Sequence, residues 1–338
     1  MADTLDARVE TSDRLGPSDL AAVTHLVEAA TEADGLHPLS EHVMLHLRFG
    51  GEGPARHLLV FTSADGEPER LAAYAHLDPT DTVDGSSAEI VVLPQLRHHG
   101  VGRLLVKSLE RASPDGRLRL WAHGQLAGAR ALASSLGYER SRELWQMRRS
   151  LYAPLTAVAL PEGMTLRTFR PGADDEAWLA VNAAAFASHP EQGGWTLDDL
   201  HRRMAEPWFD AAGFLVLQDA DGSIAGFHWT KVHGGDHLSA DPTAQVSGPH
   251  AHEGHGHDPI GEVYVVGVAP KHQGRRLGRT LTVAGLRHLR HLGLPQAMLY
   301  VDADNTAAIR TYTALGFTRW DVDAMFARPS PGSDTIKP

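Results

Sequence analysis

The stretch "VGVAPKHQGRRLG", residues 266–278, decides the fold predicted for this chain. The β-branched and aromatic residues of "GEVYVVGVAP" (261–270) form a short apolar block that ends at Pro270, which predicts a buried strand. From Gly274 onward the pattern changes, because apolar residues recur at helical spacing over 277–292 and Gly293 follows as a stop. The order is therefore strand, turn and helix.

The chain continues with three further expected elements. "AMLYVD" (297–302) predicts a strand, "NTAAIRTYTAL" (305–315) a helix that Asn305 can cap and Gly316 can close, and "FTRWDVDAMFA" (317–327) a last strand. The segment 261–327 thus predicts a complete α/β unit.

The first half of the chain repeats this order. Strands are expected at 88–94, 118–124 and 138–149, with helices at 96–112 and 127–137. Pro270 follows Pro94 by 176 residues (270 − 94), and Gly316 follows Gly137 by 179 (316 − 137). Two matched spacings between different residue types indicate an internal duplication. We therefore expect an N-terminal domain at 1–150, a proline-containing linker at 151–163 and a C-terminal domain at 164–328.

The composition and charge of the chain exclude several classes of function. The 338 residues carry a net charge of −11 with a pI near 6.0, so there is no general basic field for nucleic acid or anionic lipid. There is no cysteine, which excludes disulfides and thiolate chemistry. The N-terminus is polar, and no apolar run is long enough to span a bilayer. We expect a soluble, cytoplasmic monomer that binds small molecules, with neither a nucleic-acid nor a membrane partner.

The turn between the strand and the helix suits an anion. The unpaired N–H groups of a helix N-terminus and the positive end of its dipole converge there. Glycine allows close approach, and Arg275, Arg276 and Arg279 add positive charge. The alternative is an ordinary turn with solvated arginines.

These residues resemble the pyrophosphate loop of the GNAT family of acetyl-CoA-dependent N-acetyltransferases, which has the form Gln/Arg-x-x-Gly-x-Gly/Ala. "RHHGVG" (97–102) fits this form, whereas "QGRRLG" (273–278) has Arg276 where the family has its first glycine. The resemblance implies an α/β fold made of tandem duplicated GNAT domains, each with a mixed central sheet flanked by helices. It also implies acetyl-CoA as co-substrate.

By the same resemblance, the cofactor-binding residues fall into two sets. The C-terminal set is Val266, Gly267, Val268, Gln273, Gly274, Arg275, Arg276, Leu277, Gly278, Arg279, Asn305, Thr306, Ala307, Ala308, Ile309 and Arg310. The N-terminal set is Ile90, Val91, Val92, His98, His99, Gly100, Val101, Gly102 and Arg103.

Amide acetylation needs a base for the attacking amine and an acid for the departing thiolate. Glu262 is the candidate base and Tyr312 the candidate acid, because Tyr312 shares a helix face with Ile309 and Leu315. The alternatives are a solvated glutamate and a core tyrosine. The GNAT resemblance implies that Tyr312 protonates the thiolate, that Asn305 contacts the cofactor, and that the N–H near Val268 binds the thioester carbonyl.

The first copy lacks these groups. Ser86 falls opposite Glu262, Ala133 opposite Tyr312 and Leu126 opposite Asn305. We therefore predict that the active site lies in the C-terminal half, and that the N-terminal copy is structural or binds acetyl-CoA without turnover.

Four stretches carry a narrower resemblance: "HPEQGGWT" (189–196), "GFHWTKVH" (226–233), "GEVYVVGV" (261–268) and "LYVDADNTAAIRTYTALGF" (299–317). They are similar to the mycothiol synthase family, tandem GNAT enzymes that acetylate the cysteinyl amine of cysteinyl-glucosaminyl-inositol. The resemblance implies that Glu191, Lys231, Glu262 and Tyr300 line the substrate pocket and that Glu41 reaches it from the N-terminal half. Carboxylates, a lysine and a phenol suit a cationic substrate rich in hydroxyls.

The segment 233–258 carries six histidines: His233, His237, His250, His252, His255 and His257. Its glycine and proline content predicts a loop without fixed coordination geometry, so we expect no metal site there, loose metal binding being the alternative.

Other functions remain open on sequence. A GNAT enzyme for an aminoglycoside, polyamine or protein amine would share the coenzyme loop. A non-catalytic acyl-CoA sensor would not need Glu262 and Tyr312. A metal-storage protein built on the histidine loop would bind metal tightly and stoichiometrically.

Overall fold

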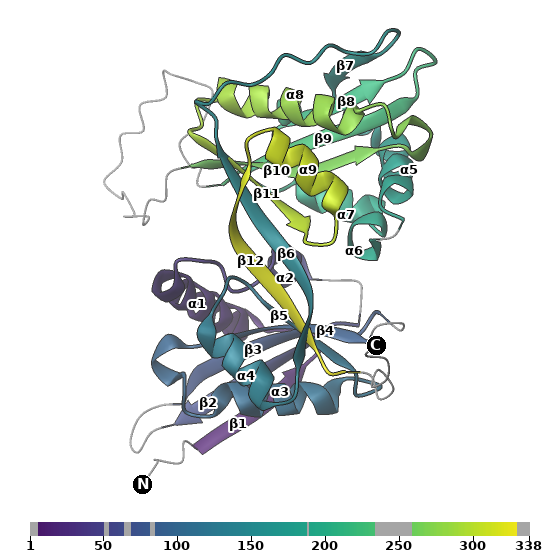
Figure 1. Cartoon of the computed structure of the whole chain (residues 1–338). Helices are drawn as coiled ribbons and strands as arrows, with labels where there is room; N and C mark the ends of the chain where they lie inside the picture. The colour runs from purple at the N-terminus through teal and green to yellow at the C-terminus, as the bar shows by residue number, and fades with distance from the viewer. Residues whose placement is uncertain are drawn as a thin grey trace, which may run out of the picture. The chain divides into compact units, whose positions relative to one another are not determined.

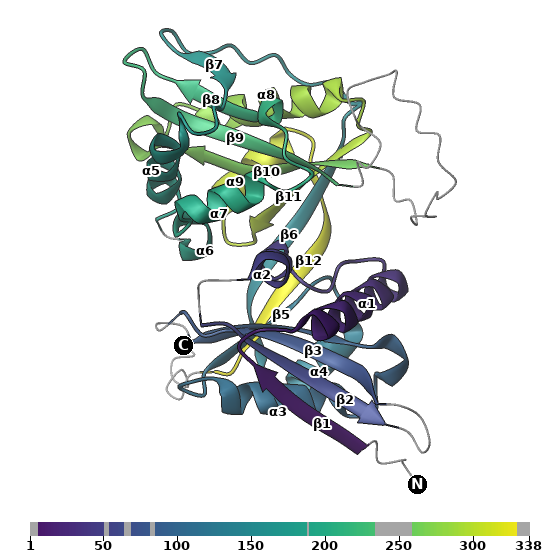
Figure 2. The same cartoon turned by 180° about the vertical axis from the view of Figure 1, so that it is seen from behind.

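The computed structural model describes residues 6–50, 54–63, 69–81, 85–187, 189–233 and 259–329. It divides into two compact units (Figures 1 and 2), one formed by residues 1–144 with 321–338 and the other by residues 145–320. Across the described ranges, no helix is both long enough and apolar enough to cross a membrane.

The first unit contains a sheet with the strand order β1-β2-β3-β4-β5-β12-β6. Its strands are β1 (Asp6–Ser12), β2 (Arg56–Ser63), β3 (Arg70–Asp78), β4 (Ser86–Val92), β5 (Leu118–Ala122), the first part of β6 (Glu139–Ser150) and most of β12 (Thr318–Ala327). Its helices are α1 (Pro17–Asp34), α2 (Glu41–Phe49), the short η1 (Pro94–Leu96), α3 (Val101–Ala112) and α4 (Ala127–Ser135).

Helices cover both faces of this sheet, and the side chains of β2 show why. Leu58 packs into one apolar cluster with α3 and α4, whereas its neighbour Leu59 packs into another with α1 and α2. Successive residues of a strand point to opposite faces, so each face gains its own core. The face under α1 and α2 also contains Tyr74 of β3.

The second unit repeats this plan with the strand order β6-β11-β10-β9-β8-β7. The remaining strands are β7 (Thr165–Thr168), β8 (Phe214–Gln218), β9 (Ile224–His233), β10 (Ile260–Val268) and β11 (Gln296–Asp302). Its helices are α5 (Asp175–Ala185), α6 (Pro190–Gly193), α7 (Leu197–Met204), η2 (Ala211–Gly213), η3 (Pro270–His272), α8 (Leu277–His291) and α9 (Thr306–Ala314).

The element order confirms the predicted duplication. The run β4, η1, α3, β5, α4 and β6 in the first half matches β10, η3, α8, β11, α9 and β12 in the second. One predicted boundary moves: α3 begins only at Val101, and not at residue 96, because Gly100 has a left-handed backbone (φ 87°) and serves as its N-cap. The sheet of each copy contains both parallel and antiparallel pairs, for example β4–β5 and β3–β4.

The compact units differ from the predicted domain ranges in the placement of one strand. Ala324 to Ala327 of β12 pair antiparallel with Ala122 to Arg119 of β5, so the last strand completes the sheet of the first unit. Phe326 joins the core of that unit. The expected linker 151–163 lies within the second unit, where Leu151 is part of the apolar core.

Candidate active site

The site begins where two parallel strands of the second unit separate. β10 and β11 pair at two positions in the described part of the chain: Gly261 pairs with Ala297, and Glu262 pairs with Met298. On its other side β10 stays paired with β9 up to Val268. The edge of β10 over 263–268 that faces β11 is therefore left for another partner. Val266, Gly267 and Val268, predicted to bind acetyl-CoA, lie on this segment.

Glu262 is buried at the point of separation. The residue is 7% exposed. Its carboxylate accepts a hydrogen bond from the His233 ring, with 2.6 Å between Nε2 of His233 and Oε2 of Glu262. Burial raises the pKa of Glu262, but the hydrogen bond from His233 and the electrostatic effects of His233 and Lys231 outweigh it and hold the pKa below its usual value. Glu262 is therefore ionised at neutral pH.

Lys231 stands directly opposite Glu262 in the antiparallel ladder between β9 and β10. It is 8% exposed, and its ammonium lies 4.6 Å from the ring centre of Trp208 and 5.4 Å from that of Tyr264. Aromatic faces attract a desolvated cation. The structure therefore brings together two residues predicted from the sequence, Glu262 and Lys231, as a buried pair of opposite charges.

The turn after β10 has the same backbone shape in both copies. Gly274 (φ 76°) and Arg276 (φ 60°) are left-handed in the second copy, and His98 (φ 64°) and Gly100 (φ 87°) are left-handed at the matching positions of the first. Each copy thus uses one glycine and one bulky residue for two left-handed positions. Arg276 has replaced the expected glycine without changing the turn.

This turn presents its donors at the start of α8. Arg276 is the N-cap residue and makes no side-chain cap hydrogen bond, so the first N–H groups of the helix stay available. Neighbouring side chains brace the turn: Gln273 donates to the Val268 carbonyl at 3.3 Å, and Arg275 Nη1 lies 3.2 Å from His272 Nδ1. Such an N-terminus fits a diphosphate group.

Tyr312 lies on α9 and is partly buried against the same apolar cluster as Val266 and Ile309. Its ring meets Phe317 edge to face at 5.9 Å. Burial raises the pKa of Tyr312 to about 12, so the phenol keeps its proton at neutral pH. At the start of this helix Asn305 accepts a hydrogen bond from the Ala308 N–H at 3.1 Å, which confirms the predicted cap.

The other predicted substrate residues are less well defined by the structure. Tyr300 lies on β11, is 40% exposed and accepts a hydrogen bond from the Gln146 amide at 2.8 Å. Glu191 lies in α6, but its side chain is outside the described atoms. Glu41 is the first residue of α2 in the first unit. The roles of these three residues stay predictions.

The matching positions of the first copy are chemically inert. Ser86 is buried and its hydroxyl lies 3.0 Å from that of Ser113. Ala133 is part of the apolar core, and Leu126 is an N-cap without a side-chain hydrogen bond. These three positions offer no carboxylate, phenol or amide.

His233 was not predicted as the partner of Glu262. The sequence places it at the start of an expected loop, whereas in the structure it is the last residue of β9, two residues after Lys231 and on the same face. That alternation was the available signal. The other histidines of the segment 233–258, from His237 to His257, lie outside the described residues.

Replacing Arg276 by glycine should raise the free energy of unfolding by about 1 kcal/mol, because the left-handed backbone conformation costs free energy for arginine but not for glycine. If the guanidinium also contacts phosphate, acetyl-CoA affinity should fall in the same variant. Denaturant unfolding and calorimetric titration measure the two effects. His98→Gly is the matched control, with the same relief of strain in the first copy; equal loss of affinity in both variants would contradict a phosphate contact by Arg276.

Comparisons with known proteins agree with this geometry. The model of the acetyltransferase (GNAT) family matches residues 178–317. A mycothiol acetyltransferase from Acidothermus cellulolyticus is 56% identical, covering 95% of this chain and 94% of that protein, and one from Streptosporangium roseum is 51% identical, covering 96% and 100%. A solved tandem GNAT protein from the clavulanic acid biosynthesis pathway is 19% identical and covers 96% of this chain and 100% of its own, with a TM-score of 0.66, which supports the fold. With identity above one half over nearly its whole length, this chain belongs to the mycothiol acetyltransferase family, a tandem-domain branch of the GNAT acetyltransferases.

Proposed function

We propose that this protein transfers the acetyl group of acetyl-CoA to the cysteinyl amine of cysteinyl-glucosaminyl-inositol, giving mycothiol and free CoA. Membership of the mycothiol acetyltransferase family supports this reaction. The single structural observation that carries the proposal is the buried, ionised Glu262 at the separation of β10 and β11, beside Lys231 and His233.

The reaction joins an amine nitrogen to the thioester carbonyl carbon and breaks the bond from that carbon to sulfur. We assign Glu262 to receive the proton that the ammonium must lose, directly or through a water molecule. An ionised carboxylate also binds the cationic amine before this transfer. His233, whose side chain is 36% exposed, can stabilise the carboxylate and connect it to solvent.

The open edge of β10 supplies the second part of the proposed mechanism. Acetyl-CoA would extend along 266–268, with its diphosphate at the turn before α8, and the N–H near Val268 would support the carbonyl oxygen as negative charge develops there. Tyr312 would protonate the departing thiolate, since its phenol is protonated at neutral pH. The unpaired strand edge and the uncapped helix start fit such a ligand.

A thiol-release assay with acetyl-CoA and cysteinyl-glucosaminyl-inositol tests the proposed function. We expect CoA release that depends on this amine and exceeds release with glucosaminyl-inositol, which lacks the cysteinyl amine. A panel of an aminoglycoside, a polyamine and a lysine peptide serves as comparison. Faster turnover of any of these would assign the chain a different acceptor, and no turnover of any amine would favour a binding protein.

Replacing Arg275 and Arg279 together by glutamine should weaken acetyl-CoA binding by a few kcal/mol at most. Exposed ion contacts are screened by solvent, and the backbone donors of the turn remain in the variant. Isothermal titration of acetyl-CoA measures the change, and His99 with Arg103, which match Arg275 and Arg279 at the spacing of 176 residues, gives a control pair in the first copy. Unchanged affinity in the Arg275/Arg279 variant would move the diphosphate elsewhere.

A further inference from the structure

We propose that the first unit contains a binding site for one divalent transition-metal ion, most suitably Zn²⁺, formed by His46, His57 and His76. His46 lies on α2, His57 on β2 and His76 on β3. No residue of this group takes part in the acetyl transfer described above, so the inference does not depend on the proposed function.

The three rings converge on one point. One ring nitrogen from each histidine lies within 4.8 Å of the other two. Ring centres are 4.8 Å apart for His46 and His76, and 5.5 Å apart for each of the other two pairs. Zn²⁺ binds imidazole nitrogen at about 2.0–2.1 Å, so each ring has to move by less than roughly 1 Å to reach a shared ion.

His76 gives the strongest indication of a missing partner. It is 2% exposed, and neither of its ring nitrogens has a hydrogen-bond partner among the described residues. An unpaired buried imidazole costs free energy, and native proteins rarely leave one unexplained. A metal ion between His46, His57 and His76 would satisfy one of these nitrogens.

His57 is already held in an orientation suited to a ligand. Its Nδ1 lies 2.8 Å from the buried Tyr74 hydroxyl, which leaves Nε2 on the opposite side of the ring. Metal-binding histidines commonly have such a second hydrogen bond, because it fixes the tautomer and the ring orientation.

The duplication supplies an internal comparison. His57 pairs with His76 in the ladder between β2 and β3, and Phe214 pairs with Trp229 at the same position of the ladder between β8 and β9. Phe214 and Trp229 stack at 4.4 Å in an apolar core. The second copy therefore fills this position with aromatic rings, whereas the first copy has imidazoles. Simple packing needs no histidine here.

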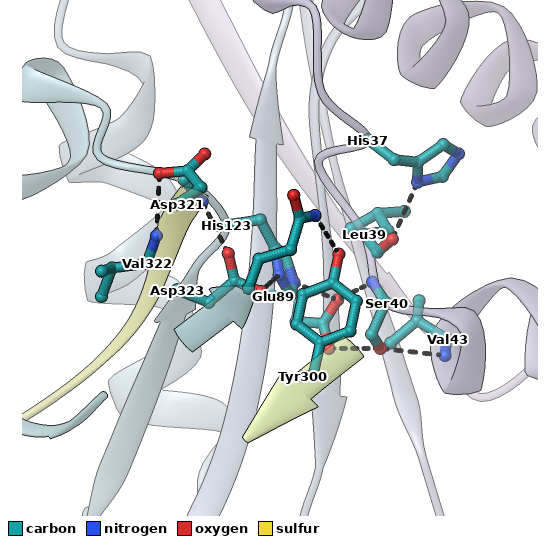
Figure 3. Close-up of polar contacts among 12 residues, drawn as sticks. His37, Leu39, Ser40, Val43, Glu89, His123, Tyr300, Asp321, Val322 and Asp323 are labelled. Carbon is teal, nitrogen blue, oxygen red and sulfur yellow. Dashed lines mark hydrogen bonds and ion pairs between the residues drawn. The ribbon is translucent and has the colours of Figure 1, made fainter. Parts of the chain in front are cut away.

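The charge around the cluster also favours a cation. Glu89 of β4 stands opposite His76 in the next ladder and is buried. It accepts hydrogen bonds from the N–H and the hydroxyl of Ser40, at 2.5 and 2.6 Å, and lies 3.3 Å from His123 (Figure 3). His123 also lies 3.1 Å from Asp323, so one imidazolium stands between two carboxylates. The net negative charge of this group would offset part of the charge of a dication held by neutral ligands.

Three histidine ligands leave the fourth tetrahedral position open for water. His42 lies one helical turn before His46 on α2 and is exposed.

The test has to separate this site from the histidine-rich segment 233–258. A starting variant carries serine at His237, His250, His252, His255 and His257, and two further variants add His46→Gln or His76→Phe. We expect the starting variant to bind one equivalent of Co²⁺ with the intense visible absorption of tetrahedral coordination, and Zn²⁺ to displace it and raise the melting temperature. Each added substitution should weaken Co²⁺ binding at least about tenfold, since one of three ligands is lost.

His46→Gln keeps the experiment decisive if His76→Phe does not fold, because His46 is only partly buried. Circular dichroism of the metal-free proteins checks the fold. The proposal is overturned if the folded starting variant binds no stoichiometric Co²⁺, or if binding is unchanged in a folded His46→Gln or His76→Phe variant.

Discussion

Replacing Glu262 by glutamine is expected to lower kcat/KM for acetyl transfer by roughly 10²–10⁴, the usual contribution of a positioned general base. Glutamine keeps the size of the side chain and can still bond to His233, but it cannot take a proton from the amine. The loss should become smaller as the pH rises, because more of the substrate amine is then already neutral. Initial rates of CoA release across a pH series measure both effects.

Ser86→Ala is the matched control, because Ser86 holds the same place in the first copy and only its hydroxyl contact with Ser113 is removed. It should leave kcat/KM within about twofold of the parent.

The lowered pKa of Glu262 allows a second check, on the pH dependence of the wild-type enzyme. Glu262 stays ionised down to pH values below its usual range, so the acid limb of the wild-type profile should not follow its titration. A full-activity Glu262→Gln variant, or a loss that does not vary with pH, would remove Glu262 from the role of base.

The duplicated fold could be predicted from the sequence because its signals are local. The apolar block at 261–270 and the helical spacing at 277–292 appear as β10 and α8, and Asn305 caps α9 as expected. Their counterparts in the first half follow the same patterns, so the two matched spacings were enough to show two copies.

The assignment of β12 to the first unit could not be predicted in this way. The last strands of the two copies, at 138–149 and 317–327, both mix polar and apolar residues, and such a composition is compatible with a strand at the edge of either sheet, so it does not state which sheet accepts the strand. The choice depends on long-range contacts such as the 2.8 Å hydrogen bond from the Gly124 N–H to Asp323 and the burial of Phe326 beside α3. Such contacts join residues about 200 positions apart.

Only part of the candidate site could be predicted from the sequence, because the rest depends on contacts between segments that are far apart in the chain. Glu262 and Lys231 were found through a resemblance, and the ladder between β9 and β10 explains why they are neighbours. Sequence spacing could not show that Trp208 and Tyr264 would surround the Lys231 ammonium, because α7, the segment after it and β10 meet only in the folded unit. The histidines of the first unit were overlooked because His46, His57 and His76 have no metal-binding spacing along the chain.

Replacing Tyr312 by phenylalanine is the second substitution with a large expected effect. It should lower kcat by roughly 10²–10⁴ and change KM far less, because a proton given to the thiolate as it departs stabilises the transition state and not the bound substrate. The loss should not come from packing, since phenylalanine retains the ring that meets Phe317. Steady-state kinetics with acetyl-CoA as the varied substrate separate the two constants.

The pH profile gives this assignment an independent check. Because burial raises the pKa of Tyr312 to about 12, the wild-type kcat should show no loss from deprotonation of this phenol between neutral pH and pH values well above 9, whereas an ordinary tyrosine would begin to ionise there. Tyr152→Phe is the control, because Tyr152 is 81% exposed and should tolerate the change without effect on either constant.

An acetyl donor whose leaving thiol is more acidic needs less help from an acid, so it should recover part of the activity of Tyr312→Phe but not of Glu262→Gln. If Tyr312→Phe raises KM alone, or if the activated donor restores both variants equally, Tyr312 contributes binding or packing, and the proton for the thiolate comes from another group or from water.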